Sequence, residues 1–167
     1  MKRFLGVLVL LALVAAAPGA SAQAPVGYGA AGALADTDIT VAEALTYALQ
    51  DEYLAQARYA AAIAQFGNRQ PFGQIRKSEQ RHVAALHRLA DRHGLPVPEG
   101  IPSFPAVASL AQALEYAVTA EEQNVAMYEK LAGLPDLPRD ARAVFLNQSG
   151  TSRKHLMALR GALRRVR

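Results

Sequence analysis

The sequence contains no cysteine and no tryptophan, and aromatic residues make up only 7% of its 167 positions. Without cysteine there can be no disulfide, no thiolate metal site and no iron–sulfur cluster. Any metal bound by the side chains must therefore use carboxylate and imidazole, a donor set that suits iron, manganese or zinc better than Cu(I). No stretch alternates apolar and polar residues with a period of two over a useful length, so we expect no β-strand.

A strong excess of one charge is also missing, because the formal net charge is only +4. The N-terminus has the features of a secretory signal peptide: Lys2 and Arg3, an apolar run over residues 4–17, and small residues before a predicted cleavage point after Ala22. A retained N-terminal anchor is the alternative. Cleavage would remove two basic residues and lower the net charge to +2, too little to indicate nucleic-acid binding. We therefore expect an exported protein, periplasmic or extracellular, without stable membrane insertion after the signal is removed.

After a signal peptide at 1–22, we expect a flexible leader at 23–39, because this segment is rich in Ala and Gly and has no periodicity. A single domain then follows at 40–166. Its apolar residues recur at alternating steps of four and three, the pattern of helices packed lengthwise in a bundle. The predicted helices cover about residues 41–66, 71–93, 107–132 and 138–166.

Local signals define most of the helix ends. Thr40 and Glu43 form a capping box at the first helix, and Gly67, Gly94 and Gly133 follow the ends of the first three helices. We expect Asp136 to cap the fourth helix, with Pro138 in its first turn. Residues 94–105 contain four prolines. In a polyproline-like conformation they span about 37 Å, which is long enough to cross from one end of a bundle to the other.

Five polar residues interrupt the apolar seams of these helices. Glu79 and His82 lie three positions apart on the second helix and therefore share one face. Burial of a carboxylate and an imidazole is costly unless they are paired or bind a metal. The complete set of predicted metal ligands, one or two from each helix, is Glu52, Glu79, His82, Glu121 and His155.

The two halves of the domain resemble each other. Glu52 and Tyr59 are repeated 69 positions later as Glu121 and Tyr128, and the Glu79–His82 segment is repeated 73 positions later as Ser152–His155. Two helical hairpins joined by a long crossover would form an all-α four-helix bundle with approximate two-fold symmetry. The polar seam positions would then meet at mid-height. A glutamate from each of two helices with Glu-x-x-His from the others is the di-metal pattern of ferritin-like bundles.

The sequence resembles the ferritin-like superfamily, and within it an uncharacterised exported bacterial and archaeal branch filed as a domain of unknown function. The resemblance covers roughly residues 41–163. It is carried by Asp51-Glu52-Tyr53 with Tyr59, Phe66-Gly67 with Pro71-Phe72, Glu79-x-x-His82, Gly94-Leu95-Pro96-Val97-Pro98, Glu121-x-x-Asn124 with Met127-Tyr128, and Ser152-x-x-His155-Leu156. It implies that Glu52, Glu79 and His82 hold one metal. Glu121 and His155 would hold the second, with Glu79 bridging the pair.

One position departs from that family pattern, because Ser152 stands where the fourth helix would carry a second bridging glutamate. With three ligands against two, we expect one tight metal site and a second site that is weaker or empty. Tyr59 and Tyr128 are either core residues with satisfied hydroxyls or groups that hydrogen-bond beside the metals. Gln148 and Ser152 are likewise either core residues or groups that hydrogen-bond beside the metals.

The function that follows is an exported metal-binding protein with a di-iron-type carboxylate/histidine site. Iron is the first expectation for the metal, one or two ions, with manganese or zinc as alternatives. In enzyme form the protein would be a non-haem oxidoreductase acting on iron with oxygen or peroxide. The alternatives are a non-catalytic metal binder and a metal-free four-helix interaction module. Catalytic residues, substrate, electron donor and a homodimeric state are left open by the sequence.

Overall fold

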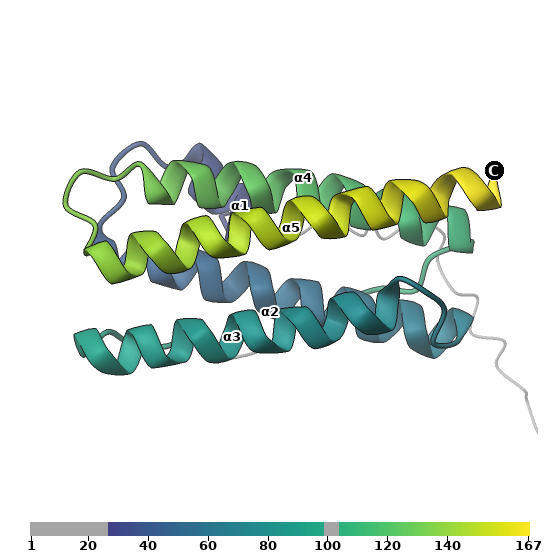
Figure 1. The fold of residues 1–167 in the computed structure, drawn as a ribbon, viewed down its shortest axis with the longest axis horizontal. Helices are drawn as coiled ribbons and strands as arrows, with labels where there is room; N and C mark the ends of the chain where they lie inside the picture. The colour runs from purple at the N-terminus through teal and green to yellow at the C-terminus, as the bar shows by residue number, and fades with distance from the viewer. Residues whose placement is uncertain (1–26, 99–103) are drawn as a thin grey trace, which may run out of the picture.

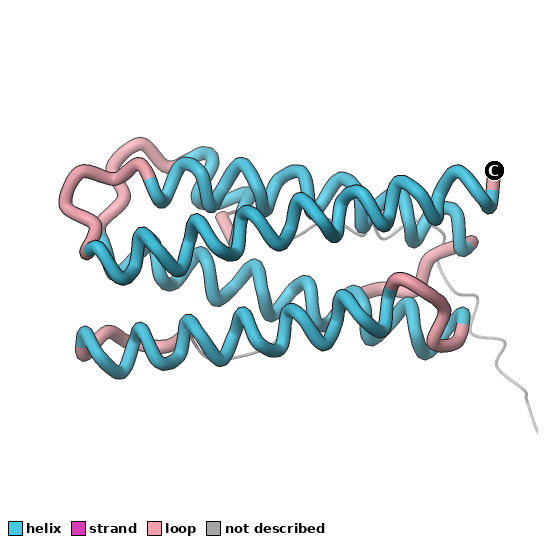
Figure 2. Tube along the Cα trace, in the orientation of Figure 1, coloured by secondary structure: helices cyan, strands magenta, loops and turns pink. Residues whose placement is uncertain are grey.

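Helices account for about three quarters of the residues that the computed structural model describes, which are residues 27–98 and 104–167. The described residues contain helices and loops but no strand (Figure 2), which confirms the predicted all-α class. The elements are α1 (Gly29–Ala35), α2 (Val41–Phe66), α3 (Phe72–His93), α4 (Leu110–Ala132) and α5 (Arg139–Val166). The predicted signal peptide, residues 23–26 of the predicted leader and the middle of the proline-rich linker lie outside the described residues.

The four long helices form two antiparallel hairpins, α2 with α3 and α4 with α5 (Figure 1). The hairpins pack on each other through α2 against α4 and α3 against α5. In Figure 1, α3 ends at one end of the bundle and α4 begins at the other. The two helices that the linker joins therefore have their linker ends at opposite ends of the bundle, a separation that the length of the proline-rich segment can span.

The caps agree with the sequence at some helix ends and correct it at others. Thr40 accepts a hydrogen bond from the Glu43 amide while the Glu43 carboxylate accepts one from the Thr40 amide, the predicted capping box. Gly94 ends α3 in the left-handed conformation, with φ of 61°. The expectation for Asp136 is wrong: the residue before α5 is Pro138, with no side-chain cap. α4 begins at Leu110, later than expected, because Ser109 caps it.

A flexible leader is expected at residues 23–39, but part of this segment forms α1, a short helix with buried Ala30 and Ala33. It packs against α2 and α4. Gly29 begins it with φ of 56°, and a Cβ at this position would lie 3.0 Å from the Cα of Asp51. The small residues that weakened the helix signal in the sequence are thus what allow the two backbones to approach.

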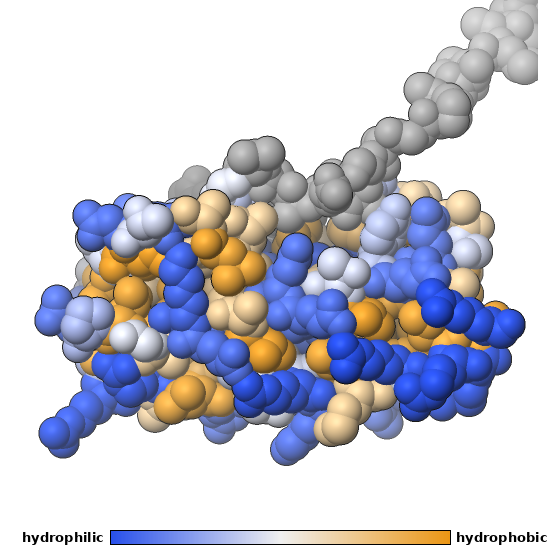
Figure 3. All heavy atoms as spheres, turned by 90° about the horizontal axis from the view of Figure 1, so that it is seen from above, coloured by the Kyte–Doolittle hydropathy of each residue, from blue (hydrophilic) through white to orange (hydrophobic). Residues whose placement is uncertain are grey.

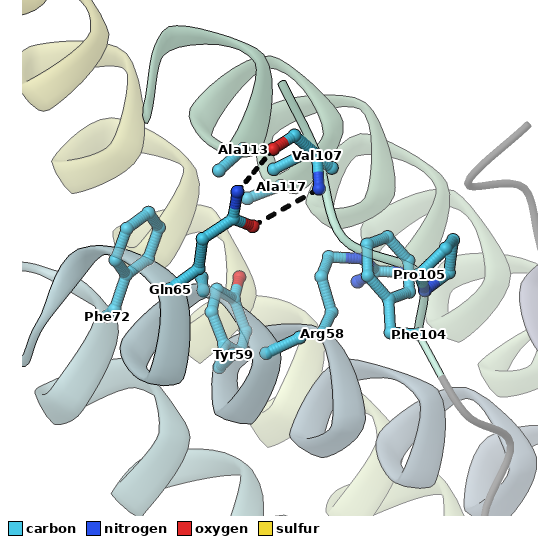
Figure 4. Close-up of a pocket in the computed structure, with 11 residues that line it drawn as sticks. Arg58, Tyr59, Gln65, Phe72, Phe104, Pro105, Val107, Ala113 and Ala117 are labelled. Atoms are coloured by element: carbon cyan, nitrogen blue, oxygen red, sulfur yellow. Dashed lines mark hydrogen bonds between the residues drawn. The ribbon is translucent and has the colours of Figure 1, made fainter. Parts of the chain in front are cut away.

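The end of the linker is docked onto α2 (Figure 4). The side-chain amide of Gln65 donates to the carbonyl of Val107 and accepts from its backbone N–H. The Arg58 guanidinium lies 5.2 Å from the centre of the Phe104 ring, within the range of a cation–π contact. These contacts tie the crossover to the α2 side of the bundle just before α4 begins.

The apolar core consists of two separate clusters. One includes Leu45, Leu86 and Leu131, and the other includes Phe72 and Leu114. Tyr128 belongs to the first cluster and Tyr59 to the second. The buried carboxylates and imidazoles lie in the same helices between these clusters, so the core is divided by a polar layer.

The outer faces of the helices are charged. Figure 3 shows hydrophilic residues interspersed with apolar ones across the face seen from above. Three α4 glutamates seven residues apart pair with three exposed α5 arginines seven residues apart: Glu115 with Arg167, Glu122 with Arg160, and Glu129 with Arg153. In the part of the chain that the structure describes, no helix is both long and apolar enough to span a membrane.

Candidate metal centre

The five residues predicted as metal ligands are all buried within the bundle. The relative exposure of the three glutamates is 0–3%, and that of the two histidines is 7%. α2 supplies Glu52, α3 supplies Glu79 and His82, α4 supplies Glu121, and α5 supplies His155. Each of the four long helices therefore contributes to the polar layer, as the seam pattern predicts.

The five residues form two groups that share Glu79. In the first, Glu52, Glu79 and His82 each offer a ligand atom, and these atoms lie within 4.8 Å of one another. The Nδ1 atom of His82 is 2.7 Å from Glu79 Oε2 and 3.4 Å from Glu52 Oε1. Atoms that bind one ion at about 2.0–2.2 Å must lie this close together.

The second group repeats this arrangement in the other half of the bundle. Glu79, Glu121 and His155 again offer ligand atoms within 4.8 Å of one another. His155 Nδ1 is 2.9 Å from Glu79 Oε1 and 3.6 Å from Glu121 Oε2. Glu79 thus presents Oε1 to one group and Oε2 to the other, and it is the only residue in both.

Hydrogen bonding tests whether these residues fit a metal. The Nδ1 atoms of His82 and His155 and one oxygen each of Glu52, Glu79 and Glu121 are buried without a hydrogen-bond partner. They are close to one another but not aligned as donor and acceptor. Unpartnered buried polar atoms are costly. Oxygen and nitrogen atoms that converge in this way have the chemistry and the spacing of metal ligands, so the two clusters could hold metal ions.

The charges of the metal-free cluster lead to the same conclusion. Burial and the negative charge of Glu79 raise the pKa of Glu52 to about 7. Burial by itself would lower the pKa of His82, but the carboxylates of Glu52 and Glu79 outweigh it and raise that pKa to about 10. For His155 the balance of burial against Glu121 and Glu79 raises the pKa to about 9. Protons therefore supply the positive charge that the carboxylates require when no metal is bound.

Two tyrosines each hold one oxygen of a glutamate. Tyr128 on α4 donates to Glu52 Oε1 on α2, and Tyr59 on α2 donates to Glu121 Oε1 on α4, both at 2.6 Å. Burial, followed by the charge of the bonded glutamate, raises the pKa of each phenol well above its usual value. Both phenols therefore remain donors. Each orients a carboxylate whose other oxygen has no hydrogen-bond partner.

The remaining predicted neighbours are buried in the same layer. Gln148 is 2% exposed and donates its amide to the backbone carbonyl of His82 at 3.2 Å. Ser152 is 1% exposed, and its hydroxyl has no hydrogen-bond partner among the described residues. It occupies the α5 position that corresponds to Glu79 in α3. The departure from Glu-x-x-His therefore lies inside the site.

Sequence reasoning assigned no role to Asp51 and Asn124, although both are buried. Asp51 Oδ2 accepts from the Asn124 side-chain amide at 2.8 Å, which joins α2 to α4. Asp51 Oδ1 accepts from the backbone N–H of Ala30 at 3.0 Å, which joins α2 to α1. Asp51 precedes Glu52, and Asn124 follows Glu121 by three positions. Their closeness to the seam, and their place in the segments that carry the family resemblance, were the signals that could have identified them.

Comparisons with known proteins bear on the fold. No protein-family model matches the chain, and no curated protein matches it. Among solved structures, it is similar to hypothetical protein MJ0754 from Methanococcus jannaschii DSM 2661. The TM-score is 0.69 and the sequence identity 25%, over 78% of this chain and 85% of that one. The likeness supports the helical architecture, whereas membership of the ferritin-like superfamily remains a prediction.

Proposed function

We propose that this protein is an exported, ferritin-like metal-binding protein whose bundle core holds one or two metal ions. The observation that carries the proposal is the convergence of five buried ligand atoms that have no hydrogen-bond partner. Glu52, Glu79 and His82 would hold one ion. Glu79, Glu121 and His155 would hold the other, with Glu79 bridging.

The donor set favours iron, with manganese or zinc as alternatives, since all ligands are oxygen or imidazole nitrogen. Bound iron or manganese would supply electron exchange with dioxygen or peroxide at an open coordination position. The protein's own contribution is to keep the glutamates ionised and oriented, through Tyr59 and Tyr128. The apolar clusters pack on either side of this layer along the bundle.

The test is metal content per chain, by elemental analysis after loading with Fe(II), Mn(II) or Zn(II). The wild type should carry one or two ions, and Glu79→Ala should lose both because Glu79 belongs to both groups. His155→Ala should lose the ion bound with Glu121. Glu122→Ala is the matched control for Glu121→Ala, because it removes a neighbouring glutamate that is exposed and paired with Arg160. A wild type that stays empty with every metal would refute the proposal.

Redox activity and export each need a separate test. Ferrous oxidation or peroxide consumption by the loaded protein, lost in Glu79→Ala, would identify an oxidoreductase. Tight metal binding without either activity would identify a non-catalytic metal binder. For export, expression of the full chain in a bacterial host should yield a processed form that begins at Gln23 and lies outside the cytoplasm. An unprocessed chain in the cytoplasm would contradict the export proposal.

A further inference from the structure

The substitution of serine for a fourth glutamate leaves the proposed centre asymmetric. Ser152 and His155 stand three positions apart on α5, as Glu79 and His82 do on α3. We propose that a small carboxylate-type monoanion from solution binds beside Ser152 and completes the two-metal centre. This inference rests on the proposed function, and it adds a ligand class that the protein's own side chains do not provide.

Charge balance is the first argument. Two divalent ions bring four positive charges, whereas Glu52, Glu79 and Glu121 bring three negative charges. An uncompensated charge in a buried layer is costly, so the two-metal form favours one further anion. With a single metal the three carboxylates already exceed the ion's charge. The anion should therefore bind together with the second metal and not with the first.

An unsatisfied hydroxyl is the second argument. Ser152 is 1% exposed, and its hydroxyl has no hydrogen-bond partner among the described residues. A hydroxyl can donate to an anion. The Gln148 amide already donates to the carbonyl of His82, so the Ser152 hydroxyl is the group that would donate to the anion.

A groove that reaches the His82 side of the centre is the third argument. Its volume is about 440 Å³, it lies between α3 and α5, and its lining includes His82, Gln148 and Thr151, the residue before Ser152. Arg81 and Asn147 also line it, and none of the described residues that line it is acidic. The groove thus brings solvent to the histidine side of the centre and presents a cation to an entering anion.

Thermodynamic linkage makes the inference measurable. If the anion binds only to the two-metal form, it must tighten the second metal by the same factor by which that metal tightens the anion. Formate is the probe, since it is the smallest carboxylate. We expect saturating formate to raise the affinity of the second Zn(II) or Mn(II) by about 10-fold or more, within the usual range of such couplings, and to leave the first unchanged.

The decisive variant is Ser152→Glu, which restores the carboxylate on the chain itself. The full-length variant should bind the second metal more tightly without formate, and formate should no longer help. Ser152→Ala, a small change that keeps the fold, should lose several-fold of the formate effect with the hydroxyl. Ala158→Glu adds the same charge at an exposed position of α5 and should keep the full formate effect. Metal-competition titration and formate calorimetry are the readouts.

The outcomes separate this inference from the proposal on which it rests. Two metals bound with no effect of formate would overturn the inference alone. An equal formate effect in Ser152→Glu and wild type, or its loss in Ala158→Glu, would do the same. A protein that binds no metal under any condition would refute both.

Discussion

Replacement of Tyr128 by phenylalanine tests whether the phenols prepare the glutamates for metal. The Tyr128 hydroxyl donates to Glu52 Oε1 at 2.6 Å in a fully buried setting. The substitution removes one oxygen atom and keeps the ring that packs against Phe145. Its effect should therefore be confined to the carboxylate, which loses a donor that stabilises its ionised form.

The size of the effect follows from the type of hydrogen bond. A hydrogen bond to a charged group contributes about 1.5–3 kcal/mol, which corresponds to roughly 10- to 150-fold in an equilibrium constant. Loss of a hydrogen bond that orients a metal ligand typically costs about 10- to 100-fold in metal affinity. We expect Tyr128→Phe to weaken the ion held with Glu52 within this range. Tyr59→Phe should do the same for the ion held with Glu121.

The assay is competition for Zn(II) against a chromophoric chelator, with urea unfolding to verify that the variant is folded. Tyr53→Phe is the matched control. Tyr53 follows Glu52 in the sequence, but its hydroxyl contacts His87 Nε2 at 2.7 Å. The metal affinity of the Tyr53→Phe variant should therefore stay within about twofold of wild type. Wild-type affinity in a folded Tyr128→Phe variant, or an equal loss in Tyr53→Phe, would refute the reasoning.

The further predictions concern the effect of pH on metal binding and on stability, the anchoring of α1, and the cap of α2. Metal should bind more tightly as pH rises from 6 to 9, because His82, His155 and Glu52, with pKa values of about 10, 9 and 7 without metal, must release protons. Conversely, these raised pKa values mean that the melting temperature of the metal-free protein should fall as pH rises from about 5 to 10. A flat profile in either experiment would contradict this. Asp51→Ala should lower the free energy of unfolding by about 2–4 kcal/mol in urea titration, since it removes the links to Ala30 and Asn124; a change below about 0.5 kcal/mol would show that these links are dispensable. Thr40→Ala should cost about 1 kcal/mol through the lost capping box, and an unchanged unfolding midpoint would disprove that contribution.

The sequence by itself determined the helical class, most helix ends and the five polar seam positions. These depend on local chemistry: the spacing of apolar residues, the glycines after helices and the capping box at Thr40. The internal repeat also paired Glu52 with Glu121 and His82 with His155, because equivalent positions in two matching hairpins meet at equivalent heights. A residue that breaks an apolar seam is visible without any structure.

Only the tertiary structure decided how those side chains use their atoms. It showed that each phenol crosses to the glutamate of the other hairpin, that Glu79 offers one oxygen to each group, and that Asp51 anchors α1. It also turned residues 29–35 from an expected leader into a packed helix. These features depend on contacts between helices far apart in the chain, where orientation and close approach decide the outcome. Spacing within one helix carries no information about either.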